Sequence, residues 1–353
     1  MSVFDHTEYD NHEQVLFCRA PEANLFAIIA IHDTTLGPAA GGCRMWPYAS
    51  FDEAVTDVLR LSRAMSYKNA LAGLPLGGGK SVIIGDPKKD KNEKLLTAFA
   101  RSVQRLGGQY YTAEDIGIGT ADVEILAKSC DYVFGLSMTG DPSPFTAQGC
   151  FEGMRAAIQH QLHRNDFTGL TVAVQGVGNV GRYVCQILHE AGANLIVTDI
   201  DPRAVAYTVE HFGATAVAPE AIYSQEADIF SPCAMGGILN DNTIPQLKAR
   251  IVAGVANNQL REPRHGRVLH DHGILYAPDY VINAGGMLNA SGDIFGEHDV
   301  QRVMERVQAL HDTTLKIFVT AQREGRPPSD VADDLAREKI AAGKMAKTAS
   351  HVS

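Results

Sequence analysis

Two lysines and one aspartate in the first half of the chain lie among small and apolar residues, a setting that favours chemistry over solvation. Lys68 lies in MSYKNALAG, Lys80 follows three glycines in GLPLGGGKSVIIGD, and Asp115 lies in TAEDIG. Most lysines are solvated surface charges, but a lysine enclosed by apolar neighbours can exchange protons with a nearby carboxylate. Asp115 also fits a simple turn or N-cap residue. The residues alone therefore predict a site with paired lysines and a carboxylate.

The glycines before Lys80 do not form a phosphate-binding loop. In that motif a glycine stands five residues before the glycine that precedes the lysine, and here this position is Leu74. A helix should also begin at the lysine, whereas residues 81–84, SVII, are typical of a strand. Lys80 therefore does not belong to a phosphate-binding loop and needs another explanation.

The second half of the chain carries a glycine pattern that fits a dinucleotide. A strand-like run at residues 170–175 ends in Gly-x-Gly-x-x-Gly, and a helix opens directly after it. About twenty residues after the last glycine, an aspartate ends the next strand-like run, where a carboxylate accepts ribose hydroxyls and repels a 2′-phosphate. This complete pattern predicts an NAD-binding domain, and Arg203 leaves NADP as the alternative. The predicted contacts are Gly176, Gly178, Asn179, Val180, Gly181 and Asp199.

Alternating elements must position these residues. In the first part we expect a strand at 25–31, a helix at 51–67 capped by Ser50, and a helix at 94–106. Two prolines at residues 141–149 indicate a domain boundary. Beyond it, helices alternate with strand-like runs, which predicts a parallel sheet with crossover helices. The expected strands after residue 175 are 194–198, 229–231, 251–254 and 280–282. A helical run at 297–322 and a tail helix at 329–347, capped by Ser329, complete the chain.

Composition sets the limits of function. The 353 residues are enough for two domains, and 45% are hydrophobic. The net charge of −10 argues against a nucleic-acid partner, and no apolar run is long enough to span a membrane. The polar N-terminus does not resemble a signal peptide, and the six cysteines form no CxxC pair. We therefore expect a cytoplasmic protein with reduced thiols and no metal site.

Six motifs in order along the chain resemble the Glu/Leu/Phe/Val amino-acid dehydrogenase family. They are GPAAGGCRM, MSYKNALAGLPLGGGKSVI, TAEDIG, QGVGNVG, GVANNQL and PDYVINAGG. The resemblance implies NAD-dependent, reversible oxidative deamination of an L-amino acid to a 2-oxo acid and ammonia. It also implies a homo-oligomer and a two-domain α/β fold. Residues 1–140 and 325–353 would form the substrate-binding and oligomerisation domain, and residues 141–324 the Rossmann-like NAD-binding domain.

The same resemblance assigns roles to individual residues. Lys68 would hold the substrate α-carboxylate, Lys80 would polarise the 2-oxo group and activate water, and Asp115 would be the general acid/base at the amino group. The glycines before Lys80 would then leave room for the substrate carbonyl. Further substrate contacts are Gly41, Gly42 and Asn283, and the residues around the nicotinamide are Thr146, Asn257 and Asn258.

The substrate side chain would meet four apolar residues, Ala40, Ala113, Met287 and Ala290. Glutamate enzymes of the family have a lysine and a serine at the positions of Ala40 and Ala290, so a glutamate side chain would be buried here without a partner. Ala113 resembles the leucine branch of the family, and leucine, valine and isoleucine should overlap as substrates. A phenylalanine or tryptophan preference remains an alternative. Two further alternatives are a 2-hydroxy-acid dehydrogenase and an NAD-binding protein without catalytic activity, but both would lack this set of lysines and aspartate.

Overall fold

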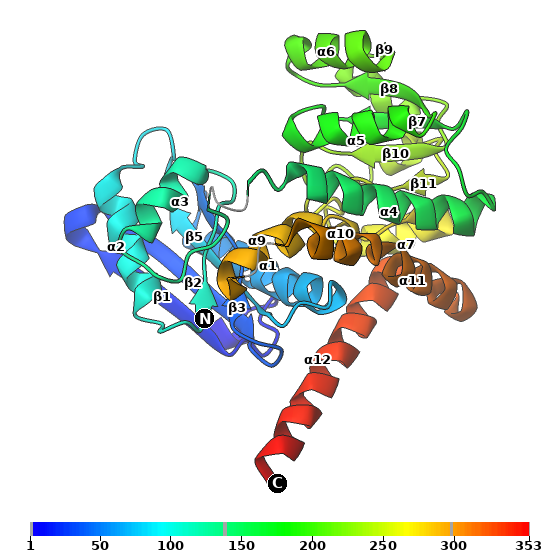
Figure 1. Cartoon of the computed structure of the whole chain (residues 1–353). Coiled ribbons are helices and arrows are strands. Elements are labelled where there is room, and N and C mark those ends of the chain that lie inside the picture. The colour runs from blue at the N-terminus through cyan, green and yellow to red at the C-terminus, as the bar shows by residue number, and fades with distance from the viewer. Residues whose placement is uncertain (1–2, 137–139, 297–298, 353) are drawn as a thin grey trace. The chain divides into compact units, whose positions relative to one another are not determined.

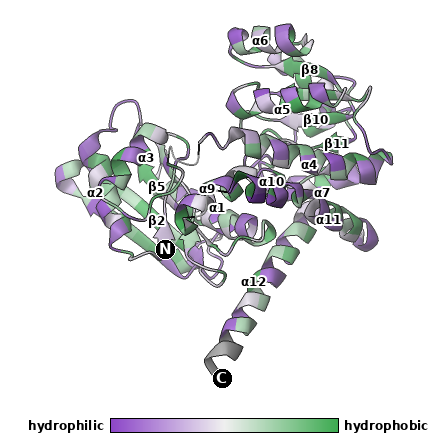
Figure 2. Ribbon diagram, in the orientation of Figure 1, coloured by the Kyte–Doolittle hydropathy of each residue, from purple (hydrophilic) through white to green (hydrophobic). Residues whose placement is uncertain are grey.

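The chain divides into two compact units, each with its own sheet (Figure 1). The computed structural model describes residues 3–136, 140–296 and 299–352, with side chains described up to Lys347. The first unit comprises Met1–Gly140, Ala290–Asp299 and Ala336–Ser353, and the second comprises Asp141–Asn289 and Val300–Leu335. Hydrophobic residues are concentrated in the strands, whereas hydrophilic residues alternate with them along the helices (Figure 2).

The sheet of the first unit has β5 at its centre. The strand order is β1-β2-β5-β3-β6, and β4 also pairs with β5. β2 is antiparallel to both β1 and β5, whereas β3 and β4 run parallel to β5. The strands are β1 (Gln14–Ala20), β2 (Leu25–Asp33), β3 (Ala39–Ala40), β4 (Cys43–Trp46), β5 (Gly77–Ile84) and β6 (Tyr110–Tyr111).

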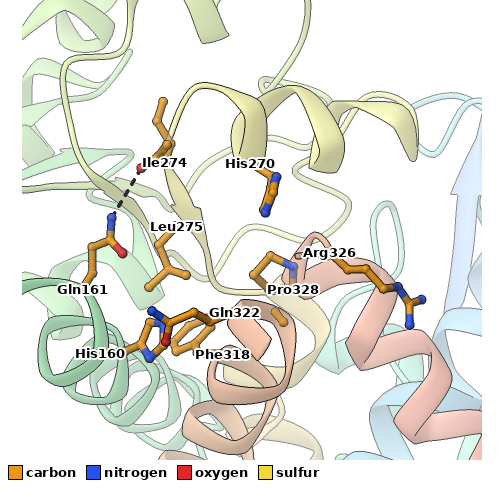
Figure 3. Close-up of a pocket in the computed structure, with 11 residues that line it drawn as sticks. His160, Gln161, His270, Ile274, Leu275, Phe318, Gln322, Arg326 and Pro328 are labelled. Carbon is orange, nitrogen blue, oxygen red and sulfur yellow. Dashed lines mark hydrogen bonds between the residues drawn. The ribbon is translucent and has the colours of Figure 1, made fainter. Parts of the chain in front are cut away.

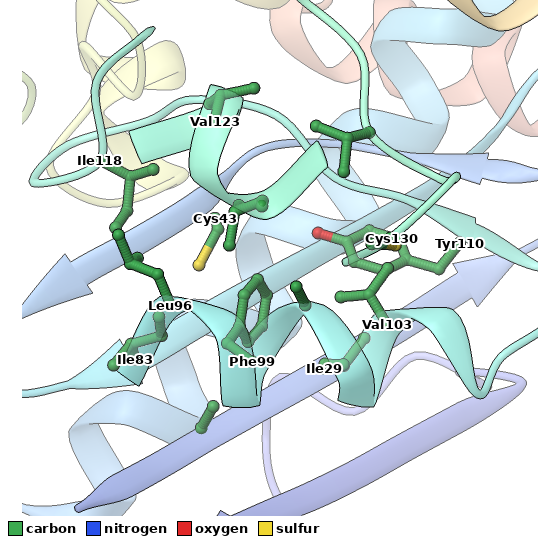
Figure 4. Packing of buried hydrophobic residues seen from close by; sticks show 14 of the residues in the cluster. Ile29, Cys43, Ile83, Leu96, Phe99, Val103, Tyr110, Ile118, Val123 and Cys130 are labelled. Carbon is green, nitrogen blue, oxygen red and sulfur yellow. The ribbon is translucent and has the colours of Figure 1, made fainter. Parts of the chain in front are cut away.

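Helices cover both faces of this sheet. Helix α1 (Phe51–Leu71) packs Val58 and Leu59 against Val82 of β5 on one face. Helices α2 (Glu93–Gln104) and α3 (Thr120–Ala127) cover the other face, where Ile83 and Phe99 are buried (Figure 4). Because side chains alternate along a strand, residues 78, 80 and 82 leave β5 on the α1 face. The strand thus directs the side chain at position 80 towards the helix that carries Lys68.

The start of α1 confirms the predicted cap. The Ser50 hydroxyl accepts the Glu53 backbone N–H at 3.1 Å, and the Glu53 carboxylate accepts the Ala49 N–H at 2.7 Å. One of the N–H groups left open at the helix start, and the N–H of the residue before the cap, therefore have partners.

The three glycines before Lys80 are strand residues packed against the protein itself, which corrects the interpretation that they leave room for a substrate. A Cβ added to Gly77 would overlap the Asp33 carbonyl, and one added to Gly78 would lie 2.5 Å from Ser66 Cα. A Cβ on Gly79 would lie 2.6 Å from the Tyr110 ring. Glycine is required here because β5 lies in direct backbone contact with its neighbours.

The second unit contains the predicted parallel sheet. Its order is β12-β11-β10-β7-β8-β9, and all pairings are parallel. The chain winds outwards from β7 to β9 and then from β10 to β12 on the other side, so the order reverses between β7 and β10. The strands are β7 (Thr171–Gln175), β8 (Asn194–Thr198), β9 (Thr215–Ala216), β10 (Ile229–Pro232), β11 (Ile251–Val252) and β12 (Leu275–Tyr276).

The α-helices of the chain from residue 143 onwards are mostly crossovers and terminal elements. They are α4 (Ser143–Leu162), α5 (Asn179–Glu190), α6 (Pro202–Phe212), α7 (Arg264–Asp271), α8 (Asp279–Ile282), α9 (Gly285–Phe295), α10 (Val300–Gln308), α11 (Leu310–Glu324) and α12 (Pro328–Val352). Short 3-10 helices occur at Val3–Asp5, Pro21–Ala23, Pro219–Ser224 and Ile244–Gln246.

Three expectations about elements are wrong. Residues 280–282 form part of helix α8, and the strand expected there is β12, a few residues earlier. The run expected at 297–322 is two helices, α10 and α11, which meet at Ala309; residues 297–298 lie outside the described residues. Ser329 lies inside α12 and does not cap it.

The tail returns to the first unit later than residue 325, where the sequence analysis placed the boundary. The start of α12 belongs to the second unit, where the Tyr280 hydroxyl donates to Asp333 at 2.5 Å. Its remainder belongs to the first unit, where Arg337 Nε donates to the Tyr67 hydroxyl at 2.9 Å and Lys339 to the Ala70 carbonyl. Residues 290–299 also belong to the first unit. Two boundaries between the units therefore fall inside continuous helices, at residues 289–290 in α9 and 335–336 in α12.

Three expectations from the sequence concern thiols, metal ligands and membrane-spanning helices. All six cysteines are free thiols. Within residues 3–136, 140–296 and 299–352 no cluster of three or more His, Cys, Asp or Glu side chains is arranged to hold a metal ion. No helix in the same ranges is long and apolar enough to cross a membrane.

Two buried histidines lie together in the first unit, with ring centroids 4.8 Å apart. His12 Nδ1 accepts the Asp10 N–H, so Nε2 carries the proton that the Leu59 carbonyl accepts at 3.1 Å. Burial and the neighbouring His32 lower the pKa of His12 to about 4. Burial also lowers the pKa of His32 to about 4, although Asp10 acts in the opposite direction. Both rings are therefore held neutral in the folded protein.

We expect these histidines to make the first unit acid-sensitive. Because their folded pKa lies below the ordinary value of 6.5, their contribution to stability is complete above pH 6.5 and is lost as the pH falls towards 4. Two protons taken up on unfolding give a slope of up to ~2.7 kcal/mol per pH unit. Urea unfolding, followed by fluorescence of Trp46, the single tryptophan, measures this unit. His12→Gln/His32→Asn should flatten the slope, whereas exposed His211→Gln should leave it unchanged.

Candidate active site

Lys80 and Asp115 form an ion pair at the centre of the first unit. The Lys80 ammonium lies 3.1 Å from Oδ2 of Asp115, and their side chains are 8% and 16% exposed. Backbone pairing with Ala30 of β2 fixes Lys80 in the sheet. The predicted lysine and carboxylate are therefore in direct contact.

Asp115 lies in a tight turn that is locked against β4. Its N–H donates to the Ile118 carbonyl at 3.2 Å, and the Ile118 N–H donates back at 2.9 Å. Gly117 in this turn has φ +82°, and a Cβ there would overlap the Met45 carbonyl. Burial alone would raise the pKa of the Asp115 carboxyl, but the charges of Lys80 and Arg44 outweigh it and lower that pKa to about 2. The carboxylate is thus held in its charged form.

Arg44 of β4 is the member of this site that sequence reasoning missed. Its Nε donates to Oδ2 of Asp115 at 2.9 Å, and its terminal nitrogen donates to Oδ2 of Asp57 at 2.9 Å. The Tyr48 hydroxyl donates to the same Asp57 oxygen at 2.6 Å. The one available signal is an arginine between Cys43 and Met45, which are both fully buried, because a charge within a buried strand requires a partner.

The predicted glycine pair lies between β3 and β4, beside the lysine strand. A Cβ on Gly41 would overlap the Gly79 carbonyl, and one on Gly42 would overlap the Glu114 carbonyl. The buried Tyr110 hydroxyl donates to the Gly41 carbonyl at 2.7 Å and lies 2.9 Å from the Ser81 hydroxyl. These contacts bring the glycine pair, β5 and the Asp115 segment into one cluster.

Two of the predicted pocket alanines belong to the same cluster. Ala40 ends β3 and is fully buried, and Ala113 is buried in the segment before Asp115. The Ala113 carbonyl accepts the Cys43 N–H at 2.8 Å, which ties this segment to the start of β4. Lys68 lies in the last turn of α1 and is partly buried.

The second half of α9 is anchored next to Ala113 within the first unit. Oδ2 of Asp293 accepts the N–H groups of Gly135 and Leu136 at 2.7 and 2.9 Å. Gly135 faces Ala113, because a Cβ built on it would be 3.8 Å from the Ala113 Cβ. Ala290 lies one helical turn before Asp293 and Met287 one turn earlier still. The helix that carries Ala290 is therefore bonded to the Gly135 segment, which contacts Ala113.

In the second unit, the predicted fingerprint forms the turn between β7 and α5. Gly176 has φ +97°, and Gly181 packs so closely that a Cβ would overlap the Gly176 carbonyl. Gly178 is the N-cap of α5, which begins at Asn179 and Val180, and it has no atom within 4 Å of a built Cβ. The N-terminus of α5 therefore offers backbone N–H groups beside an open glycine.

Asp199 follows β8 and faces this turn. Its Oδ2 accepts the Val177 N–H at 2.7 Å, and its Oδ1 accepts the Asp201 N–H at 2.9 Å. A carboxylate has lone pairs left beyond these two bonds. Arg203 is highly exposed and forms its ion pair with Asp201 and not with Asp199.

Asn283 and its neighbours continue the same carboxyl edge of the sheet, after β11 and β12. The Asn283 amide donates to Oδ1 of Asn257 at 2.9 Å, and Asn258 follows with φ +52°. Within the described chain, the buried Oδ1 of Asn283 accepts no hydrogen bond. Thr146 begins α4 and lies against Gly286, where a Cβ would be 2.5 Å from its hydroxyl. An unfilled buried acceptor beside the fingerprint edge fits a polar ligand group.

A separate cavity of about 200 Å³ lies in the second unit (Figure 3). Gln161 on its wall donates to the Gly273 carbonyl at 3.4 Å. Its charged member, Arg326, is paired with Glu324 and Asp334. None of the predicted site residues lines this cavity, so it is not part of the candidate active site.

Comparisons with known proteins agree with this arrangement. The model of the Glu/Leu/Phe/Val dehydrogenase dimerisation domain matches residues 12–132, and that of the Glutamate/Leucine/Phenylalanine/Valine dehydrogenase matches 141–208 and 197–346. Leucine dehydrogenase of Geobacillus stearothermophilus is 53% identical over 99% of this chain and 96% of its own length. Valine dehydrogenase of Streptomyces virginiae is 46% identical over 95% of each chain. The crystal structure of L-tryptophan dehydrogenase from Nostoc punctiforme is 45% identical, with a TM-score of 0.83 over 95% of this chain and 97% of that one.

The two-unit α/β fold and these matches define an amino-acid dehydrogenase. The chain belongs to the Glu/Leu/Phe/Val dehydrogenase family. The resemblance and the fold class expected from the sequence are therefore confirmed.

Proposed function

We propose that this protein catalyses the NAD-dependent, reversible oxidative deamination of a leucine-type L-amino acid to its 2-oxo acid and ammonia. The observation that carries the proposal is the buried Lys80–Asp115 pair, which lies among small apolar residues of the first unit. The 53% identity to a leucine dehydrogenase over nearly the whole chain supports the leucine-type substrate.

In this proposal the first unit supplies the proton chemistry. Lys68 binds the substrate α-carboxylate, and Gly41 and Gly42 line the site with backbone alone. Asp115 acts as the general acid/base at the substrate amino group, where it takes a proton only transiently and passes it on. Its low pKa keeps the carboxylate charged between these steps. Lys80 then polarises the substrate carbon–nitrogen or carbon–oxygen bond and directs water to it. The direct Lys80–Asp115 contact allows a proton to pass between the two groups.

The side-chain pocket we propose is apolar. Ala40, Ala113, Met287 and Ala290 would surround the substrate side chain, and Ala40 and Ala113 are buried. A glutamate side chain would leave its carboxylate unpaired there, at a cost of several kcal/mol. Leucine, isoleucine and valine differ by single methylenes and should overlap. The small size of the alanines favours one second candidate, a phenylalanine- or tryptophan-preferring enzyme.

The second unit fits NAD through its own residues. The N-terminus of α5 with Gly176, Gly178 and Gly181 would bind the pyrophosphate, and Asp199 would accept the ribose hydroxyls. Thr146, Asn257 and Asn258 would lie by the nicotinamide, and the unfilled Oδ1 of Asn283 would accept from the nicotinamide amide or the substrate ammonium. NAD supplies the hydride acceptor when bound.

A homo-oligomer is part of the proposal. The match to a dimerisation domain over residues 12–132 supports it. So does the edge strand β1, where Phe17 and nearby Phe51 are more than half exposed. Sedimentation of the full chain tests this point, and a monomer at assay concentration would contradict it.

The test of function is NADH absorbance with L-leucine, L-valine, L-isoleucine, L-phenylalanine, L-tryptophan and L-glutamate, each with NAD and with NADP. We expect the highest kcat/KM with leucine and NAD, and ammonia-dependent NADH consumption with the matching 2-oxo acid. A higher kcat/KM with an aromatic substrate selects the second candidate. No ammonia-linked turnover with any of them overturns the function.

Gly178→Ala should weaken NAD binding without harming the fold. Its φ of −69° suits alanine and no protein atom lies within 4 Å of the new Cβ, but the methyl group would stand where the pyrophosphate approaches. We expect the NADH dissociation constant, measured by fluorescence titration, to rise about tenfold or more. The thermal midpoint should be unchanged. Gly213→Asn, at a positive-φ helix end of the same unit, is the control, and an unchanged NADH affinity in Gly178→Ala would contradict the assignment.

A further inference from the structure

Arg44 holds the far side of the Asp115 carboxylate and is itself held from behind. Oδ2 of Asp115 receives two cations, Arg44 Nε at 2.9 Å and Lys80 Nζ at 3.1 Å. The other end of the guanidinium donates to Asp57 of α1, which also accepts the Tyr48 hydroxyl. With a side chain only 14% exposed, Arg44 is fixed in one orientation by β4 and α1 together.

We propose that Arg44 is a positioning residue for the reaction: it fixes the Asp115 carboxylate against Lys80 and keeps it charged while Lys80 changes its protonation. The proposal rests on the proposed function, because it acts through the roles given to Asp115 and Lys80.

Lys80 and Arg44 both contact Oδ2 of Asp115 but act differently, because only the lysine can lose its proton and its charge. A lysine that exchanges protons during turnover ceases at times to stabilise its carboxylate partner. An arginine stays protonated throughout, so Arg44 supplies a constant charge at the same oxygen. Without it, a proton released in the site would remain on Asp115 each time Lys80 became neutral.

The groups around Asp115 come from every neighbouring element. They are Lys80 of β5, Arg44 and Cys43 of β4, Tyr110 of β6, and, behind Arg44, Asp57 of α1 and Tyr48. Burial raises the pKa of the Cys43 thiol to about 12, and burial with Asp57 raises the pKa of Tyr48 further still. Among these neighbours, Lys80 and Arg44 therefore carry the positive charges that face the carboxylate.

The experiment measures kcat and kcat/KM against pH for the full-length enzyme and three variants. Arg44→Gln should lower kcat about tenfold to a hundredfold with little change in KM. It should also move the acid limb of the kcat/KM profile to higher pH, because a carboxylate with one cation binds protons more readily. Arg44→Lys should return the acid limb to its wild-type pH, because the positive charge is kept. It should restore only part of kcat, because lysine lacks the planar guanidinium that bonds Asp115 and Asp57 together.

Asp57→Asn is the matched control, because it loosens Arg44 from α1 and leaves the Arg44–Asp115 bond in place. We expect a smaller fall in kcat than in Arg44→Gln and an unmoved acid limb, because the Arg44 charge stays beside Asp115. If Asp57→Asn and Arg44→Gln have equal effects and neither moves the limb, Arg44 only braces β4 against α1, and the proposal is overturned. Trp46 fluorescence establishes that each variant is folded.

A second measurement is independent of turnover. The carboxyl ¹³C resonance of Asp115 in aspartate-labelled protein, identified with Asp115→Asn, should stay at its charged position in the wild type and in Arg44→Lys at every pH at which the protein is folded. In Arg44→Gln it should titrate at higher pH, within that range. If the wild-type protein turned over no amino acid, the function would fail, and this titration would still decide whether Arg44 keeps the carboxylate charged. An Asp115 titration that is the same in wild type and Arg44→Gln overturns the proposal.

Discussion

Replacing Lys80 by alanine should lower kcat about 1,000-fold or more with every amino acid that the wild type accepts. The ammonium at 3.1 Å from Asp115 would be lost, and acid–base groups of this kind contribute factors of about 10² to 10⁴. NADH affinity should stay within about twofold of wild type, because the fingerprint glycines and Asp199 belong to the other unit. Steady-state kinetics and fluorescence titration with NADH measure the two effects separately.

Lys89→Ala is the matched control for Lys80→Ala. Lys89 also lies 3.1 Å from an aspartate, Asp86, in the same unit, but its side chain is 79% exposed. An exposed pair of this type contributes little to stability, and we expect normal turnover. If Lys80→Ala kept kcat within about tenfold of wild type, the role assigned to Lys80 would be refuted.

Replacing Gly78 by alanine should unfold or severely destabilise the first unit. The new Cβ would lie 2.5 Å from Ser66 Cα and closer still to the Ser66 backbone nitrogen, so no side-chain rotation can relieve the overlap. Separating α1 from β5 would open the core around Val58 and Val82. Overpacking costs ~1–3 kcal/mol when side chains can adjust, and we expect at least the upper end here. Urea unfolding followed by Trp46 fluorescence measures the loss.

Gly119→Ser provides the comparison for Gly78→Ala. Gly119 is the N-cap of α3 with extended φ and ψ, and nothing lies within 4 Å of a Cβ built there. Serine suits an N-cap, so stability should be unchanged or slightly higher. An unfolding midpoint of Gly78→Ala equal to wild type would mean that β5 and α1 are less closely packed than described.

The sequence predicts the second unit well because its signals are local. The glycine turn, the helix after it and the aspartate of the next strand lie within about thirty residues of one another. Short buried segments are less predictable. Residues 280–282, Tyr-Val-Ile, favour a strand by residue type but form helix α8, since periodicity cannot distinguish such a short apolar run. Helix α9 opens with two glycines, and its start is held by contact of Gly285 with Phe145, which no local pattern reveals.

The lysine and the carboxylate of the candidate site could be proposed from the sequence, but their supports could not. Arg44 and Asp115 are 71 residues apart, and backbone hydrogen bonds from Cys43 and Met45 of β4 to the Ala113 and Ile116 carbonyls bring them together. The surroundings of the glycines before Lys80 could not be predicted from the sequence either. Their number predicts close approach, but whether a ligand or the protein's own backbone approaches depends on tertiary packing. The structure identifies Asp33, Ser66 and Tyr110 as their neighbours.

The close packing of β5 also bears on how such an enzyme can change over evolutionary time. A Cβ at any of the three positions before Lys80 would lie within 2.6 Å of another atom, so these positions are restricted to glycine. The predicted pocket alanines instead lie on separate segments: Ala40 ends β3, Ala113 lies in the segment after β6, and Ala290 lies on α9. Ala113 and Ala290 lie outside β5 and the strands paired with it, whereas Ala40 pairs directly with Gly78 of β5. In the proposed function, substitutions at Ala113 and Ala290 would therefore change the preferred substrate side chain in single steps, while Lys80 and Asp115 stay fixed by β5 and β4.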